Sequence, residues 1–119
     1  EAYDILWDTV AAEGQSLGRA IAFNRDVRHA IECAEVLREM QGLTVLEFHR
    51  KVPLDERMRN LERFKRAESA VFVCTDAASR GLDIPNVSHV IQVGFASSAV
   101  DYLHRIGRTA RAGLLAALF

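Results

Sequence analysis

Short, continuous apolar runs alternate along the chain with stretches in which apolar residues recur at helical spacing. Runs that are apolar on both strand faces are typical of strands in a parallel sheet covered by helices on both sides. Strand and helix in alternation predict one α/β domain, a parallel sheet of about five strands flanked by helices. Ligands of such sheets bind outside the carboxyl ends of the strands. The predicted strands cover residues 19–23, 44–48, 70–75, 87–93 and 114–119.

Two of the intervening helices have a clear apolar face. Asn24 or Asp26 can cap the first, and Pro53 opens the second. The apolar positions of the first helix are Val27, Ala30, Ile31, Ala34 and Leu37. Those of the second are Leu54, Met58, Leu61 and Phe64. The other face of the second helix carries Arg57, Arg59, Arg63 and Lys65. We interpret this basic face as solvated, except at Arg57.

The composition predicts one small soluble domain. The chain has 119 residues, of which 50% are hydrophobic, enough for one core and too few for a second domain. Its net charge of −1 means that any recognition of phosphate must be local. No apolar run is long enough to span a membrane, and no membrane partner is expected. Cys33 and Cys74 stand in apolar contexts without metal-ligand spacing, which predicts buried thiols in a reducing, intracellular compartment.

Three arginines recur at a spacing of three residues near the end of the chain, at Arg105, Arg108 and Arg111. The helix that leads into them is expected to begin at Ser98 or Asp101. In helical backbone this spacing places the side chains on one face. A guanidinium is always charged and presents a planar fork of donors that matches phosphate oxygens. The cluster therefore indicates phosphate recognition, and the alternative is a solvated basic helix end that complements the helix dipole.

A second polar stretch follows the predicted strand 70–75. The chain reads TD at 75–76 and RGLD at 80–83, and HRIGRTAR begins roughly twenty residues later, at His104. In this order and spacing, TDxxxRGxD and HRIGRxxR resemble motifs V and VI of the DEAD-box RNA helicases. His104 favours this family over the DEAH group, which typically has a glutamine there. The resemblance implies the second of two RecA-like domains that close over ATP and single-stranded RNA.

The resemblance extends from about Ala20 to Gly113. The chain contains neither a GxxxxGK[ST] phosphate loop nor an Asp-Glu-Ala-Asp sequence, which belong to the first domain of the family. The resemblance implies ATP with Mg²⁺ as the cofactor. Because the two motifs are absent from this chain, the magnesium ligands are expected on the first domain. The domain alone is expected to be inactive. We expect a fragment of a larger protein, and whether residues are missing near Gly113 and Leu114 stays open.

The resemblance implies roles for the matching positions. Arg108 and Arg111 match arginines that reach the γ-phosphate across the interdomain cleft and act as arginine fingers in catalysis. Asp83 matches the acceptor of the ATP ribose hydroxyls, and Gly81 belongs to the same ATP-binding turn.

Thr75 and Arg57 match residues that bind RNA phosphates, and such contacts position a strand without reading its bases. The family typically has a glutamine three residues before this arginine, where the chain has Leu54. Asp26 stands where a small hydroxyl residue is usual, and its carboxylate would repel RNA unless a neighbouring arginine neutralises it. These departures predict an altered grip on RNA.

Four further residues support the motifs. His104 and Arg105 match positions that interlock the two domains, although they could equally hold the fold of the motif itself. Asp76 and Arg80 could form an internal ion pair that supports the motif.

The leading interpretation is an ATP-dependent RNA helicase that couples ATP hydrolysis to local unwinding of RNA duplexes or remodelling of RNA–protein complexes. Its partners would be RNA, the first RecA-like domain of the same chain and protein cofactors. Two alternatives stay open. One is a helicase-fold scaffold or protein-binding module with a weakened grip on RNA, suggested by Leu54 and Asp26. The other is a DNA-directed helicase of a related family.

Overall fold

The computed structural model describes residues 18–40, 42–84, 87–94, 96, 98–106 and 113–117. Arg108 and Arg111, the predicted arginine fingers, lie outside these residues.

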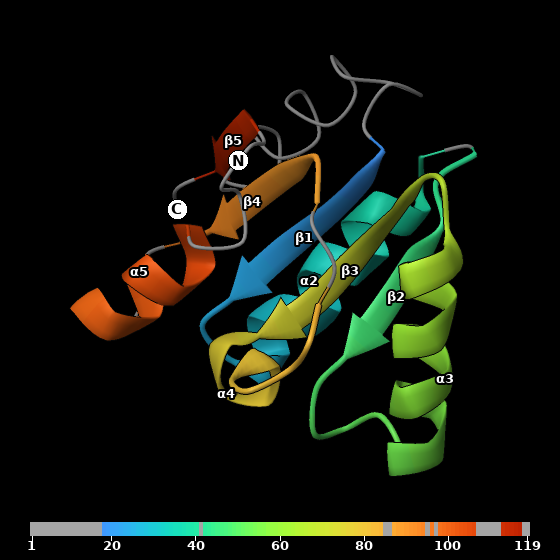
Figure 1. Ribbon diagram of the computed structural model, residues 1–119, viewed down its shortest axis with the longest axis horizontal. Helices are drawn as coiled ribbons and strands as arrows, with labels where there is room; N and C mark the ends of the chain where they lie inside the picture. The colour runs from blue at the N-terminus through green and yellow to red at the C-terminus, as the bar shows by residue number, and fades with distance from the viewer. Residues whose placement is uncertain are drawn as a thin grey trace.

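Within the described residues, five parallel strands form one sheet in the order β2-β3-β1-β4-β5 (Figure 1). Each strand overlaps one of the predicted runs, so the predicted fold class is confirmed. The central strand β1 pairs with β3 on one side and with β4 on the other. The strands are β1 Arg19–Asn24, β2 Val45–Phe48, β3 Ala70–Thr75, β4 His89–Val93 and β5 Gly113–Ala117.

The described residues also form four helices between the strands. They are α2 Val27–Arg38, α3 Leu54–Arg66, α4 Asp76–Ser79 and α5 Ala99–Ile106. Asp26 caps α2, because its carboxylate accepts the His29 backbone N–H at 3.0 Å, whereas Asn24 ends β1. At the start of α5, the Ser98 hydroxyl accepts the Asp101 backbone N–H at 3.1 Å.

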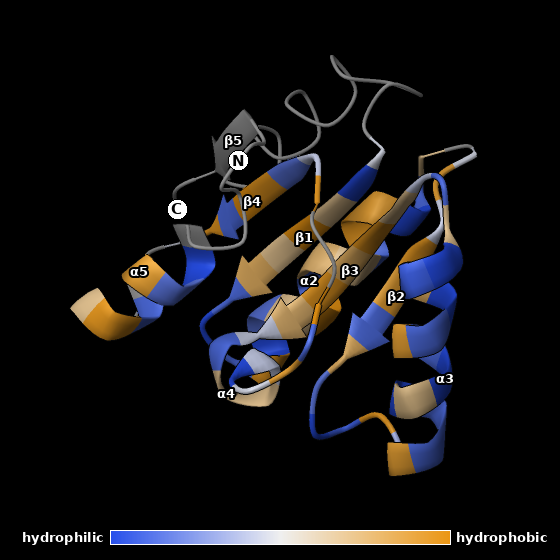
Figure 2. Cartoon of the chain, viewed as in Figure 1, coloured by the Kyte–Doolittle hydropathy of each residue, from blue (hydrophilic) through white to orange (hydrophobic). Residues whose placement is uncertain are grey.

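The sheet has an apolar core on each face, because successive side chains of a strand point to opposite sides. In β1, Ala20 and Ala22 pack on the side of α2, and Ile21 and Phe23 pack on the side of α3. Figure 1 shows α2 behind the sheet. Figure 2 shows the apolar strands at the centre and hydrophilic residues along the outer side of α3.

Two residues predicted to line the apolar face of α3 are exposed instead. Leu54 is 62% exposed and Met58 is 41% exposed, whereas Leu61 and Phe64 are buried. The cause is the rotation of the helix about its axis. Arg57, which lies between them in the helix, packs over Phe48 at the end of β2, so the side of α3 that faces the sheet carries Arg57, Leu61 and Phe64.

The two cysteines are buried in the cores on opposite faces of the sheet and form no disulfide. Burial raises the pKa of the Cys33 thiol to about 12, so this thiol stays protonated at neutral pH. Among the described helices, none combines the length and apolar character that crossing a membrane requires.

Candidate nucleic-acid interface

A pocket of about 360 Å³ opens at the carboxyl edge of the sheet. The arrowheads of β1, β2 and β3 point to this edge, where α4 lies (Figure 1). The polar residues that line the pocket are Arg25, Asp26, Arg50, Arg57 and Thr75. They come from the ends of β1, β2 and β3 and from the first turn of α3. The pocket thus brings together Thr75 and Arg57, the two residues predicted to bind RNA.

Arg50 and Arg25 line the same pocket but are not among the predicted RNA-binding residues. A positional signal could have found them, because loops at the carboxyl ends of parallel strands carry ligand contacts. Arg25 directly follows Asn24, the last residue of β1, and Arg50 follows the end of β2 at Phe48 by two positions.

Thr75 ends β3 and begins α4. Its side chain is buried within the fold, and its Oγ1 accepts the backbone N–H of Ala78 at 3.2 Å. This capping bond fixes the rotamer and leaves the hydroxyl proton able to donate to another acceptor. Thr75 can therefore donate a hydrogen bond to an anion in the pocket.

Arg57 packs over the ring of Phe48, with its guanidinium carbon 6.0 Å from the ring centroid. Its Nε is buried, and none of the described residues accepts a hydrogen bond from it. A buried donor without an acceptor costs free energy, which an anion oxygen at this atom would offset. Three arginines against one carboxylate also give the pocket lining a net positive charge, which favours an anionic ligand.

Asp26 is the acidic residue of the pocket lining. Its Oδ1 accepts the His29 backbone N–H and lies 2.6 Å from His29 Nδ1. This backbone hydrogen bond is the main cause that lowers the pKa of Asp26, and Arg25 adds a smaller attraction. Arg28 instead pairs with Glu32 at 3.8 Å. The carboxylate is therefore ionised at neutral pH, and its first role is to cap α2.

A buried ion pair joins α4 to α5. Arg105 donates to the two carboxylate oxygens of Asp76, from Nε at 2.8 Å and from Nη2 at 2.7 Å. Arg105 is 0% exposed, its Nη1 donates to the Gly94 carbonyl at 3.2 Å, and its guanidinium lies over the Phe23 ring. Because Asp76 directly follows Thr75, the pair holds the end of β3 against α5. Of the two roles considered for Arg105, interlocking the two domains or holding the fold of the motif itself, this ion pair corresponds to the second.

A second ion pair links the end of α4 to α5. Arg80 donates to Asp101 from Nε at 3.2 Å and from Nη2 at 2.7 and 2.9 Å. The hydrogen bond to Asp101 raises the pKa of Arg80, which stays charged. The ion pair between Asp76 and Arg80 that the sequence left possible is therefore not formed. Both residues pair with α5, because this helix brings a side chain of opposite charge to each of them.

The described residues predicted to bind ATP follow α4. Gly81 has a φ of +76°, a backbone conformation that a side chain would strain. Asp83 is exposed, and no described residue donates a hydrogen bond to its carboxylate, which fits an acceptor for a ligand's hydroxyl groups.

His104, in α5, packs edge-on against Phe23 at 6.1 Å. Within the described part of the chain, no three His, Cys, Asp or Glu side chains cluster as metal ligands would.

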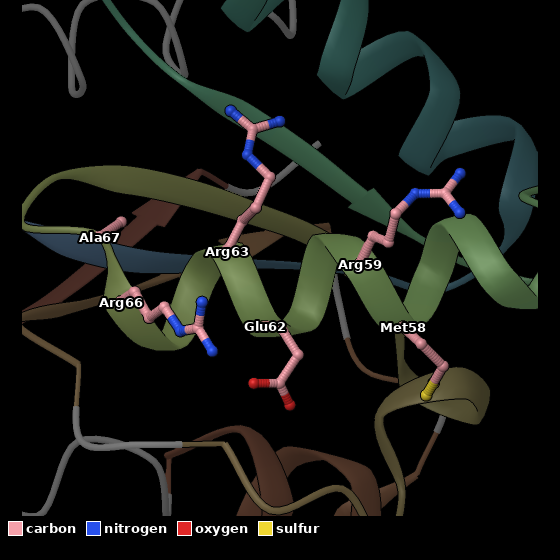
Figure 3. Close-up of a pocket in the computed structure, with 6 residues that line it drawn as sticks. All are labelled: Met58, Arg59, Glu62, Arg63, Arg66 and Ala67. Atoms are coloured by element: carbon pink, nitrogen blue, oxygen red, sulfur yellow. The ribbon is translucent and has the colours of Figure 1, made fainter.

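A second, open hollow lies on the outer face of α3 (Figure 3). It is lined by Met58, Arg59, Glu62, Arg63, Arg66 and Ala67. Arg59 pairs with Asp55 at 3.2 Å, and Lys65 pairs with Glu62 at 3.6 Å. Such exposed pairs within one helix contribute little to stability, and they support the interpretation of this side of α3 as a solvated face.

Comparison with known proteins agrees with this fold. Residues 1–113 match the family model of the helicase conserved C-terminal domain. DEAD-box ATP-dependent RNA helicase 22 of Oryza sativa subsp. japonica is 52% identical over 95 residues, which cover 80% of this chain and 16% of that protein. ATP-dependent RNA helicase MSS116, mitochondrial, of Saccharomyces cerevisiae is 42% identical over 103 residues, which cover 85% of this chain and 16% of that protein. The structure of Mss116p DEAD-box helicase domain 2 bound to an RNA duplex superimposes with a TM-score of 0.81 at 35% identity, covering 98% of this chain and 50% of the other.

The parallel sheet and its superposition on solved DEAD-box helicase domains place the fold in the class of RecA-like helicase domains. The chain belongs to the helicase C-terminal domain family, and within it to the DEAD-box RNA helicases. The predicted family is thus confirmed. The chain spans 16% of the length of the two curated relatives described above.

Proposed function

We propose that the chain is the second RecA-like domain of an ATP-dependent RNA helicase and that its pocket binds the RNA backbone. The observation that carries this proposal is the convergence of Thr75, Arg57, Arg25 and Arg50 on one pocket of a DEAD-box fold. Hydroxyl and guanidinium donors fit phosphate oxygens, and phosphate contacts carry no sequence information. The domain should therefore bind RNA with little sequence preference.

The nucleotide-binding part of the proposal rests on the segment after α4 and on α5. Asp83 would accept hydrogen bonds from the ATP ribose, and Gly81 would shape the turn that approaches it. Arg108 and Arg111 would stabilise negative charge on the γ-phosphoryl group. Mg²⁺ and the phosphate loop would be held by a first domain, so this domain alone would not hydrolyse ATP. Relatives support the use of nucleotide, since Mss116 has been solved bound to single-stranded RNA and UDP-BeF.

The two ion pairs suggest how the RNA and nucleotide parts are coupled. Asp76–Arg105 and Arg80–Asp101 both join α4 to α5. Thr75 precedes the first of these residues, and Arg108 follows α5 in the sequence. A displacement of the end of β3 by RNA would therefore move α5 with it. Domain closure would then align the arginines with ATP and unwind or remodel the bound RNA.

Protein cofactors are a further part of the proposal. Among the relatives, SrmB of E. coli is bound to RraA, and the C-terminal domain of S. cerevisiae Dbp5 is bound to Gle1. The second candidate function is a protein-binding scaffold, favoured by Leu54, which is 62% exposed at the start of α3 and has no donor for phosphate.

Steady-state ATPase activity of the full-length protein tests the proposal, with no nucleic acid, with single-stranded RNA and with DNA of the same sequence. We expect strong stimulation by RNA alone. Stimulation by DNA would favour the DNA-directed alternative, and no stimulation would favour the scaffold.

A variant pair locates the RNA contact. Arg57→Ala should reduce RNA affinity by about tenfold or more, since charge-assisted hydrogen bonds contribute roughly 1.5–3 kcal/mol. Arg63→Ala is the matched control, because it removes the same side chain from the same helix outside the RNA pocket. Equal effects of the two variants in a fluorescence anisotropy titration would contradict a specific role for Arg57.

A further inference from the structure

The turn between β2 and α3 is organised by a buried histidine. His49 is 2% exposed, and its Nδ1 accepts the backbone N–H of Lys51 at 3.3 Å. Its carbonyl accepts the Val52 backbone N–H at 3.0 Å, which closes the turn. The ring and the carbonyl of one residue thus fix the two residues that follow Arg50.

Glu47 and Arg38 set the orientation of the His49 ring. His49 Nε2 lies 3.0 Å from Glu47 Oε1, and Glu47 Oε2 pairs with Arg38 Nη1 at 2.6 Å. Since Nδ1 accepts a backbone N–H, the proton of the neutral ring is on Nε2, where it is donated to Glu47. A continuous chain of polar contacts therefore runs from α2 to the turn, through Arg38, Glu47, His49 and the Lys51 amide.

Arg50 lies at the middle of this turn and lines the RNA pocket with Arg57 and Thr75. Among the described residues, no carboxylate forms an ion pair with Arg50, although acidic residues pair with Arg38 and Arg59 nearby. Leu54, the first residue of α3, has no polar side-chain atom. The turn between β2 and α3 therefore places one unpaired guanidinium at the pocket.

We propose that Arg50 binds an RNA phosphate in this pocket and that His49 is its positioning residue. This inference rests on the proposed function, because it names additional contacts of the same RNA site. The physical basis is preorganisation: a turn fixed by a buried ring loses less conformational freedom when Arg50 binds, so more of the attraction appears as affinity.

The test measures binding of the full-length protein to a fluorescein-labelled single-stranded RNA, in the presence of a non-hydrolysable ATP analogue, across a series of KCl concentrations. Arg50→Ala should weaken binding by about five- to tenfold and reduce the slope of log K against log [KCl] by about 0.7, the value for one phosphate contact on a single strand. Arg66→Ala, on the solvated face of α3, should change neither.

The role of His49 is separated from general stability by a double-mutant cycle. His49→Leu should weaken binding, and in the Arg50→Ala background it should cause no further loss, because the residue it positions is gone. His49→Asn should restore most of the affinity, because its amide oxygen can accept the Lys51 N–H. Thermal unfolding confirms that each variant is folded, and His49→Ala, which also lacks the acceptor for the Lys51 N–H, serves in the cycle if His49→Leu is not folded.

Two results would overturn the inference: an unchanged salt slope in Arg50→Ala, or losses in His49→Leu and Arg50→Ala that multiply in the double variant. An unmodified protein that does not bind RNA would instead refute the proposed function on which the inference depends.

Discussion

Arg105 shows how a charged side chain can be part of the core. It is fully buried, and its charge is matched by both oxygens of Asp76 and by the Gly94 carbonyl. From the sequence alone, this arginine belongs to a basic cluster that indicates phosphate recognition. That inference could not separate Arg105 from Arg108, because it depends on spacing along one helix and not on what faces each position. The partner of Arg105 comes from an element 29 residues earlier in the sequence.

Removal of one partner of this pair should be strongly destabilising. Arg105→Met leaves the Asp76 carboxylate buried without a counter-charge, at a cost of about 3–5 kcal/mol in the free energy of unfolding. Urea unfolding measures the loss. Arg80→Ala should cost less, because the Arg80 side chain is 57% exposed and its removal opens the Asp101 carboxylate to water. The double variant Asp76→Asn/Arg105→Met should recover part of the stability, and no recovery would contradict the assignment of the loss to an uncompensated charge.

The elements of the fold were predictable where burial dominates. The strands of a parallel sheet are covered on both faces, so β1 and β3 are continuous apolar runs that stand out from the helices. The apolar face of α3 was predicted in part only, since the side that faces the sheet includes Arg57 and leaves Leu54 and Met58 exposed. Which side is covered depends on how the helix is rotated against the sheet, and the sequence of the helix does not contain that information.

Asp26 caps α2 and also places a negative charge in the pocket, and two substitutions separate these effects. Asp26→Ala removes the cap and should destabilise the protein by about 1 kcal/mol at pH 7. Because the folded state lowers the pKa of Asp26 below 3.8, its contribution is present above that pH and is lost as the pH falls through the lower folded value. The stability difference between the two proteins, measured by urea unfolding, should therefore be constant from pH 7 to about 5 and shrink below about 4.

Asp26→Asn should have a different effect, because asparagine caps a helix about as well as aspartate. Stability at pH 7 should change little, while the pocket loses its negative charge. RNA affinity should then rise by about two- to threefold at low salt, as expected for a nearby charge that is partly exposed to solvent. Weaker RNA binding would show that the carboxylate takes part in binding and does not oppose it.

At the scale of the whole molecule, the site consists of residues that a parallel sheet gathers from distant parts of the sequence. The resemblance to known motifs identified Thr75 and Arg57, since each occupies a recognisable position. It could not identify Arg50, whose role depends on the other residues around the pocket. It also could not predict the ion pairs of Asp76 and Arg80, because these depend on where α5 lies. Sequence motifs thus pointed to the candidate site, and the ion pairs between α4 and α5 join its parts.

That connection leads to a prediction for the full-length protein. If Arg108 stabilises charge on the γ-phosphoryl group, Arg108→Ala should lower the RNA-stimulated kcat for ATP hydrolysis by about 10³-fold or more, as loss of an arginine finger does in other nucleotide hydrolases. RNA affinity without nucleotide should stay within about twofold, because the RNA pocket is formed by other residues. Arg57→Ala should show the reverse pattern, with weakened RNA binding and a kcat that recovers at saturating RNA. A loss of kcat below about tenfold in Arg108→Ala would count against the arginine-finger role, and a simultaneous loss of RNA affinity would show that the two functions are not carried by separate residues.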